Sequence, residues 1–245
     1  MHILFRVVAV LALCGCAAGE TGPRRTLVPA SLREAGAVPV KGWLPGYDDL
    51  IVAEAAKYPE LVRLSAARVG ALCPKWDSLE DHRKRRFFAD FLRVVALFES
   101  GHDPAAMALE KAMSTDPVTR RQVVSEGLLQ LSYQDQRNFP GCAFDFAADR
   151  TRFDEDWSLQ DARKTDESAL LKSWTAKNTD RSILTPAAQF ACAVSVVSAA
   201  ARASQREGKS LLASLGYWQN LDGHTNPAAY REIVATLGAE TPYCR

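Results

Sequence analysis

One glutamate stands where acid chemistry would be possible. Glu99 shares a helical face with the apolar residues Leu92 and Val95, seven and four residues before it. Gly101 follows, and glycine is the usual residue just beyond a helix C-terminus. Apolar surroundings and the negative end of the helix dipole both disfavour an ionised carboxylate, so we expect the pKa of Glu99 to be raised. Such a group can act as a general acid near neutral pH, whereas the competing interpretation is an exposed helix-end glutamate.

A compact polar and apolar block, Ser125–Ser132, follows this helix. Gln130 lies among leucines in the block, so its amide needs a partner from protein, water or sugar. Gly127 would allow the backbone to approach a ligand closely. We therefore expect the block to lie beside Glu99 in one site.

The elements that must position these residues are predicted to be almost all helical, with at most a small sheet. Apolar residues recur at helical spacing over residues 47–72, with a break at Pro59, and over 77–100, 181–206, 211–219 and 228–237. Asp77 or Ser78 is expected to cap the helix that carries Glu99. Residues 116–124 are expected to form a short helix that Asp116-Pro117 opens.

The N-terminal stretch predicts export. Arg6 precedes a short apolar run, Val7–Leu13, and small residues follow it, which is typical of a secretory signal rather than a transmembrane helix. Leu13-Cys14-Gly15-Cys16 resembles the lipobox of bacterial lipoproteins, with Cys16 as the lipidated residue. We divide the chain into a signal segment (1–16), a tether (17–46) and a domain (47–245), with plain secretion as the alternative to anchoring.

The cysteines support an exported protein. Four cysteines remain after the signal, and in an oxidising compartment they predict two disulfides with three possible connectivities: Cys73, Cys142, Cys192 and Cys244. Their wide separation, without a CxxC or HxxxH pair, argues against a metal site. A net charge of +1 gives no electrostatic reason to expect a nucleic acid partner, and no cofactor motif is visible.

Two motifs together resemble the lysozyme-like soluble lytic transglycosylases. Phe98-Glu99-Ser100-Gly101, followed by Ser125-Glu126-Gly127-Leu128-Leu129-Gln130-Leu131, is similar to that family's helix-ending Glu-Ser pair and its Gly-Leu-Met-Gln-like block. The resemblance covers residues 87–132 and extends to Tyr217-Trp218, where the family has a tyrosine motif. It implies a mainly helical lysozyme-like fold that cleaves the bond between N-acetylmuramic acid and N-acetylglucosamine in peptidoglycan. Glu99 would be the general acid and base, and the substrate-binding residues would be Ser100, Ser125, Glu126, Gln130, Tyr133, Asp135 and Tyr217.

One residue departs from the family pattern. Glu126 stands where the family usually has an uncharged residue, and Asp135 follows closely. In a transglycosylase one carboxylate suffices, because the acetamido group and the 6-hydroxyl of the muramyl sugar assist, whereas ordinary glycosidases need two. Either residue could therefore be a second carboxylate in a hydrolase, or Glu126 could form a structural ion pair with Arg120 or Arg121.

The expected partners are peptidoglycan glycan strands and, through the lipid anchor, a membrane of the bacterial envelope. A hydrolase of peptidoglycan or of another aminosugar polymer is the first alternative. The second is a catalytically silent module that binds glycan.

Overall fold

The computed structural model describes residues 42–110, 112, 113, 115–149, 181–223 and 225–245. The described chain is mostly helical with one small antiparallel sheet, as predicted. The signal segment with Cys16 and nearly all of the tether lie outside the described residues. Trp43, in the last part of the expected tether, contacts the rings of Tyr47 and Phe190 and packs, partly buried, against the core.

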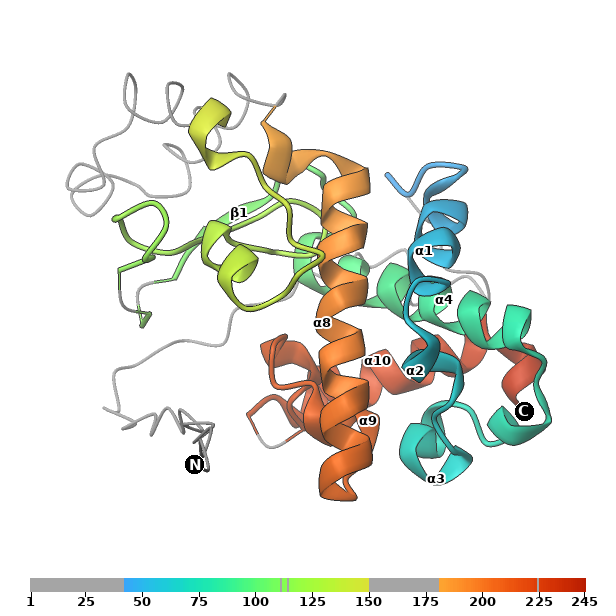
Figure 1. The fold of residues 1–245 in the computed structure, drawn as a ribbon. Helices are drawn as coiled ribbons and strands as arrows, with labels where there is room; N and C mark the ends of the chain where they lie inside the picture. The colour runs from blue at the N-terminus through green and yellow to red at the C-terminus, as the bar shows by residue number, and fades with distance from the viewer. Residues whose placement is uncertain (1–41, 111, 114, 150–180, 224) are drawn as a thin grey trace, which may run out of the picture.

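Two long helices organise the domain (Figure 1). α4 spans Asp81–Ser100 and buries nearly every side chain from Phe87 to Phe98, including four phenylalanines. α8 spans Pro186–Glu207, and its many buried alanines and serines let neighbouring helices approach closely. Both helices end at a glycine with a left-handed backbone, Gly101 and Gly208, as expected of C-terminal caps. α4 begins at Asp81 rather than at the expected caps, because Asp77 instead accepts a hydrogen bond from the Ala66 amide at 2.9 Å.

Shorter helices cover these two. α1 contacts both α4 and α8, α2 lies against α8, and α10 lies against α4. Pro59 begins α2, so the predicted break between the first two helices is confirmed. The α-helices are α1 (Tyr47–Ala55), α2 (Pro59–Val62), α3 (Ala66–Val69), α9 (Leu211–Ser214) and α10 (Pro227–Glu240). The 3-10 turns are η2 (Gly70–Leu72), η3 (Trp76–Ser78), η4 (Tyr133–Arg137), η5 (Ser182–Leu184), η6 (Gln219–Leu221) and η7 (Pro242–Cys244).

The sheet follows α4. β1 (Met107–Leu109) pairs antiparallel with β2 (Val124–Glu126), with Ala108 opposite Ser125. The expected short helix over residues 116–124 is therefore wrong. Asp116 explains this, because its carboxylate accepts the backbone N–H groups of Val118 and Thr119 at 2.7 and 3.2 Å and so makes a turn.

Two disulfides close the fold, as the cysteine count predicted. Cys73 bonds to Cys244 and ties the N-terminal helices to the chain end, and Cys142 bonds to Cys192 and ties the loop after η4 to α8. This connectivity is one of the three that the sequence left open. Disulfides fit an oxidising compartment outside the cytoplasm.

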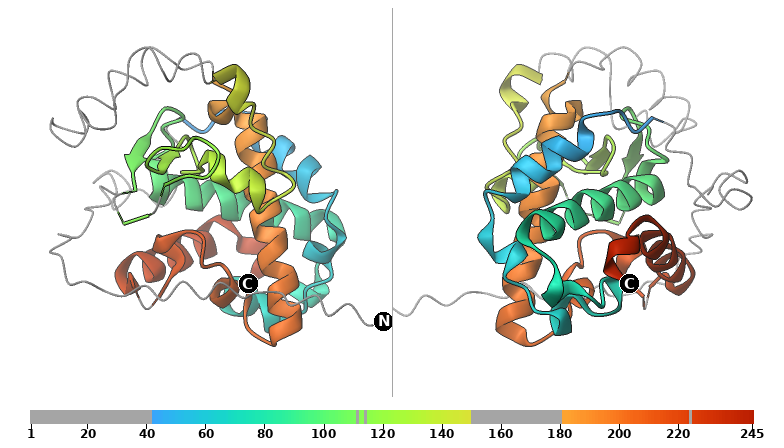
Figure 2. Two further views of the ribbon diagram at one scale, coloured as in Figure 1. Left: turned by 60° about the vertical axis from the view of Figure 1, so that its left-hand side comes forward. Right: turned by 90° about the vertical axis from the view of Figure 1, so that its right-hand side faces the viewer.

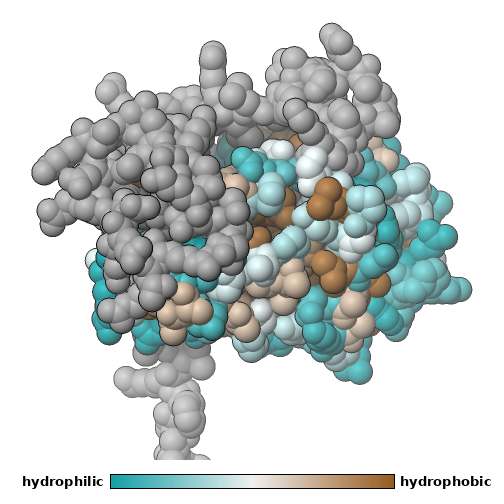
Figure 3. Space-filling model, turned by 90° about the horizontal axis from the view of Figure 1, so that it is seen from above, coloured by the Kyte–Doolittle hydropathy of each residue, from teal (hydrophilic) through white to brown (hydrophobic). Residues whose placement is uncertain are grey.

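The apolar side chains are used mainly inside the domain. α8 is long and apolar enough by composition to cross a membrane, but 67% of its most apolar stretch is buried within the protein, as in a core helix. On the face seen from above, hydrophobic surface forms small separate spots between hydrophilic residues (Figure 3). Across the part of the chain that is described, the well-exposed large hydrophobic side chains are Leu44, Leu50 and Met113.

The C-terminal end of α4 lies between two parts of the chain. In the left view of Figure 2, the segment that carries the sheet lies above this end, and the segment that follows α8 lies below it. Residues from both parts can therefore meet around Glu99.

Candidate active site at the end of α4

Glu99 lies in the last turn of α4 and is partly buried. The side-chain amide of Asn220 donates a hydrogen bond to Glu99 Oε1 at 3.0 Å and approaches the carbonyl of Phe98 at 3.4 Å. Asn226 in turn donates to Asn220 Oδ1 at 3.0 Å, which fixes the orientation of that amide. The interpretation of Glu99 as a fully exposed helix-end residue is therefore wrong. Asn220 was not predicted, because nothing near it in the sequence distinguishes it from a loop asparagine.

Ser100 joins the helix end to the block that follows β2. Its hydroxyl lies 2.9 Å from the carbonyl oxygen of Ala96, one turn earlier, and 2.9 Å from the carbonyl oxygen of Leu128. The two motifs of the sequence thus meet in space. Ser100 acts here as a link within the protein.

The block itself forms a tight turn. The backbone N–H groups of Glu126 and Leu131 each donate to the carbonyl of the other, and Gly127 between them has φ 74°. A Cβ at Gly127 would lie 2.6 Å from the side-chain amide of Gln189, so the close approach expected for a ligand is made by α8 instead. The amide of Gln130 donates to the carbonyls of Ala106 and Gly127, which satisfies it within the protein.

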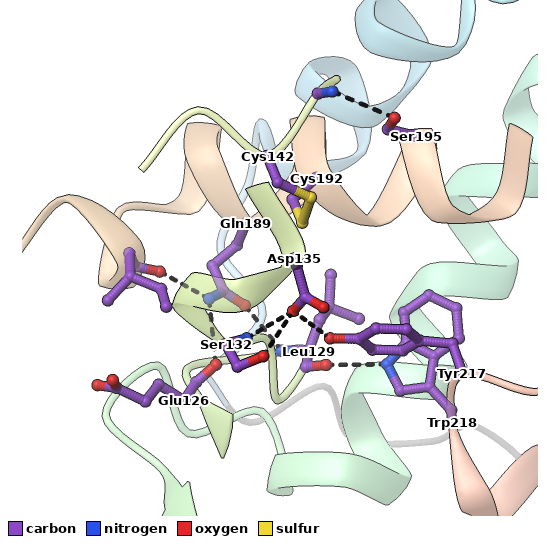
Figure 4. Close-up of a disulfide and its surroundings, with 12 residues drawn as sticks. Glu126, Leu129, Ser132, Asp135, Cys142, Gln189, Cys192, Ser195, Tyr217 and Trp218 are labelled. Carbon is purple, nitrogen blue, oxygen red and sulfur yellow. Dashed lines mark hydrogen bonds between the residues drawn. A yellow bond between two sulfur atoms is a disulfide. The ribbon is translucent and has the colours of Figure 1, made fainter. Parts of the chain in front are cut away.

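Gln189 of α8 supports this turn from inside the core (Figure 4). It accepts a hydrogen bond from the Leu129 amide at 3.0 Å and donates to the carbonyls of Glu126 and Ile183 at 3.1 and 2.6 Å. Its side chain is fully buried. A glutamine among the alanines at the start of α8 was the available signal for this role, and it was missed.

Tyr217 and Trp218 fasten the segment after α9 to the block (Figure 4). The indole N–H of Trp218 donates to the Leu129 carbonyl at 2.9 Å, and the hydroxyl of Tyr217 donates to Asp135 Oδ2. Burial, followed by the charge of Asp135 and the hydrogen bond to it, raises the pKa of Tyr217. The sequence resemblance at Tyr217-Trp218 therefore points to residues that do reach the candidate site.

Asp135 is buried rather than open to solvent. Its Oδ2 accepts the backbone N–H of Ser132 at 2.7 Å and the Ser132 hydroxyl at 3.0 Å, in addition to the hydroxyl of Tyr217. Burial raises the pKa of Asp135, and the hydrogen bonds from Tyr217 and Ser132 oppose this change. With 3% of its surface exposed, Asp135 is poorly placed to activate water directly.

Glu126 is likewise buried, and its partner differs from the expectation. It has no exposed surface and forms an ion pair with Arg181, rather than with Arg120 or Arg121. Complete burial raises the pKa of Glu126, and the charge of Arg181 opposes this. An ion pair within the core is a structural role, so Glu126 does not line an open surface.

The remaining predicted residues lie nearby but are engaged within the protein. The hydroxyl of Ser125 donates to Glu110 Oε1 at 2.7 Å, and that of Tyr133 donates to Asp149 at 2.8 Å. Both Ser125 and Tyr133 are buried. Glu110, just after β1, is a further partly buried carboxylate that sequence reasoning missed. Over the described ranges, no group of three or more His, Cys, Asp or Glu residues could hold a metal ion.

Solved structures with a similar fold are those of DslA (Bd0314). A Glu-to-Gln variant of DslA is 19% identical, with a TM-score of 0.51 over 79% of this chain and 88% of that one. A second Glu-to-Gln variant and the wild type are both 18% identical, with TM-scores of 0.52 and 0.50 over 87% of this chain and 96% of theirs. No protein-family model matches the chain, and no curated protein matches its sequence. At this level of identity the comparison establishes the fold alone.

Proposed function

We propose that the protein is a glycosidase of the bacterial cell envelope that cleaves the glycan strands of peptidoglycan, with Glu99 as general acid and then base. The observation that carries the proposal is the position of this carboxylate. It is partly buried at the negative end of a helix dipole and held by a hydrogen bond from Asn220. These surroundings suit a group that delivers a proton to a glycosidic oxygen.

Both residues expected as a possible second carboxylate are bound to other groups of the protein, which favours lytic transglycosylation. Glu126 is committed to Arg181, and Asp135 is committed to Ser132 and Tyr217. A two-carboxylate glycosidase needs its second group to contact the sugar or a water molecule beside it. With neither group available, a mechanism with one carboxylate, in which the substrate's own groups assist, is the simpler one.

A specific observation favours hydrolysis as the second candidate. Two of the similar DslA structures are different Glu-to-Gln variants, and their replaced glutamates are eleven residues apart. Glu99 and Glu110 are also eleven residues apart in this chain. Glu110 is partly buried and accepts a hydrogen bond from Ser125, so it could be the second carboxylate that Glu126 and Asp135 are not.

The envelope location is part of the proposal. The two disulfides fit an oxidising compartment, and the lipobox-like segment ending at Cys16 would anchor the domain to a membrane through residues 17–46. The domain would then work on peptidoglycan within reach of that membrane. Replacement of Cys16 by alanine, followed by membrane fractionation, tests the anchor.

Digestion of purified sacculi tests the activity. Wild type is expected to release soluble fragments, and Glu99→Gln to reduce release by at least about a hundredfold, the usual contribution of a general acid. Glu232→Gln is the matched control, because Glu232 is an exposed glutamate of α10. Release that survives in Glu99→Gln would remove Glu99 as the acid. Binding of sacculi without release by wild type would favour the silent module.

The products separate the two glycosidase mechanisms. Anhydromuramyl ends indicate transglycosylation, and reducing muramyl ends indicate hydrolysis. Glu110→Gln should leave a transglycosylase largely active but should abolish a hydrolase that uses Glu110. The same variant therefore tests the second carboxylate independently of the product analysis.

A further inference from the structure

We propose that Asn226 is a positioning residue of the candidate active site, which acts through Asn220 to hold an N–H donor against Glu99 Oε1. The inference rests on the proposed function and adds to it a second residue that supports the acid. Asn226 acts at one remove from the acid, so it is expected to change the rate of the reaction and not the binding of glycan.

The direction of the hydrogen bonds is set at the start of α10. An asparagine amide can present either its oxygen or its nitrogen to a neighbour. Asn226 is the N-cap of α10, and its Oδ1 accepts the backbone N–H of Ala229 at 3.2 Å. A backbone N–H can only donate, so the oxygen of the Asn226 amide is committed to the helix. The nitrogen of that amide is the group available to Asn220.

The orientation then passes from Asn226 to Glu99. Asn226 Nδ2 donates to Asn220 Oδ1 at 3.0 Å, which makes the oxygen the accepting side of the Asn220 amide. Asn220 Nδ2 lies 3.0 Å from Glu99 Oε1 and 3.4 Å from the carbonyl oxygen of Phe98. A half-turn of the Asn220 amide would bring two NH₂ groups together and place an oxygen against the carboxylate. Asn226 therefore excludes the turned amide.

The backbone holds both asparagines in place. Asn220 belongs to η6, which lies against α10, and the Leu221 N–H in that turn donates to the carbonyl of the buried Trp218 at 2.9 Å. The backbone N–H of Asn226 donates to the carbonyl of Asp222 at 2.8 Å. α10 also packs against α4, the helix that carries the acid. The chain of three hydrogen bonds is thus built on elements that are packed together.

This chain of hydrogen bonds matters when the acid loses its proton. As the proton moves to the glycosidic oxygen, negative charge develops on the carboxylate of Glu99. A donor already aimed at Oε1 stabilises that charge without having to turn. A turned Asn220 amide would present its oxygen to the same charge and would oppose the step. Asn226 contributes to the rate because it keeps the donor in place.

The test separates this role from the capping role of the same residue. Asn226→Asp keeps an oxygen for the Ala229 N–H but has no N–H group for Asn220, whereas Asn226→Ala lacks both. Asn226→Ala should therefore lower Tm by about 2–4 °C, and Asn226→Asp should leave it nearly unchanged.

The rates should not follow this order of stability. Both variants should reduce the maximal rate of glycan release from sacculi about tenfold or more, the effect of one hydrogen bond to a charged group. The concentration of sacculi needed for half-maximal release should stay unchanged. Asn138→Asp makes the same chemical change at an exposed asparagine and is the matched control.

Asn220→Leu shows whether Asn226 acts through Asn220. It removes the donor itself, so it should lose at least as much rate, and Asn226→Asp should then add less than about twofold. A wild-type rate in Asn226→Asp, or rates that follow Tm among the variants, would overturn the proposal, and so would equal losses with and without Asn220. If Asn226→Asp does not fold, Asn226→Ser, which also keeps a capping oxygen, takes its place.

A nitrogen-15 NMR measurement needs no turnover. The side-chain amide signal of Asn220, assigned by its loss in Asn220→Leu, should shift in Glu99→Gln and in Asn226→Asp but not in Asn138→Asp. An Asn220 signal that Asn226→Asp leaves unmoved would contradict the proposal. If wild type releases nothing from sacculi while the signal responds as expected, the proposed function fails and the positioning of the Asn220 amide by Asn226 stands.

Discussion

Replacing Gln189 with leucine should destabilise the protein through hydrogen bonds alone. Leucine is similar in size, so the change leaves little cavity, but it removes an acceptor from the Leu129 amide and a donor from the Ile183 carbonyl. The Glu126 carbonyl keeps its bond from the Leu131 amide. A buried polar group left without a partner costs about 1–3 kcal/mol, so two such groups and one weakened group should cost about 3–5 kcal/mol.

Urea and thermal unfolding followed by circular dichroism measure this change. In a chain of this size the expected loss lowers Tm by about 10 °C. Gln205→Leu is the matched control, because Gln205 lies exposed on the same helix and its replacement should change the free energy of unfolding by less than about 0.5 kcal/mol. A loss below about 1 kcal/mol in Gln189→Leu would refute the reasoning. It would mean that the turn rearranges to satisfy its own backbone.

Two further predictions concern stability. Replacing both Cys73 and Cys244 with serine opens a loop with a sequence separation of 171, so urea unfolding should report a loss of about 3–5 kcal/mol, and reductant, which opens both disulfides, should cost wild type more. For Glu60, burial acts to raise the pKa, but hydrogen bonds and charge from its serine and arginine partners on α8 lower it overall. The ionised Glu60 with its partners on α8 should therefore stabilise the protein fully above the ordinary glutamate pKa. This contribution is lost as the pH falls through the lowered pKa of Glu60. Glu60→Gln should cost up to about 1 kcal/mol at pH 7 and progressively less as the pH falls below about 4, measured by urea unfolding over that range.

The helices could be predicted because their signals are local. The apolar spacing of α4 and the glycine at its end identify the helix and its C-terminus from a few neighbouring residues. Pro59 likewise separates α1 from α2. The short strands could not be predicted in the same way. Three-residue strands carry almost no periodicity, and the turn between them depends on where the carboxylate of Asp116 finds its donors.

The site could be predicted only in part, for a related reason. Glu99 was identifiable from its own helix, but its partner Asn220 is 121 residues away in the sequence. The roles of Glu126 and Asp135 depend on Arg181 and Tyr217, which are also distant. A sequence indicates that a carboxylate is present, whereas the fold decides whether that carboxylate is committed to a partner or remains available for chemistry.

That distinction separates the acids into two roles: Glu126 and Asp135 hold the structure, and Glu99 remains for chemistry. Glu126 is held by a buried cation and Asp135 by three donors, so both carboxylates shape the turn whose carbonyls bind Trp218 and Ser100, the residue after Glu99. A carboxylate that holds such a turn cannot also move towards a sugar without releasing its donors, at a cost of about 1–3 kcal/mol for each group left unpaired. If the turn beside Glu99 is to stay rigid, neither Glu126 nor Asp135 can therefore serve as a mobile second acid. If a second acid takes part, it should be a carboxylate other than these two, and Glu110, which follows β1 and accepts a hydrogen bond from Ser125, is the candidate.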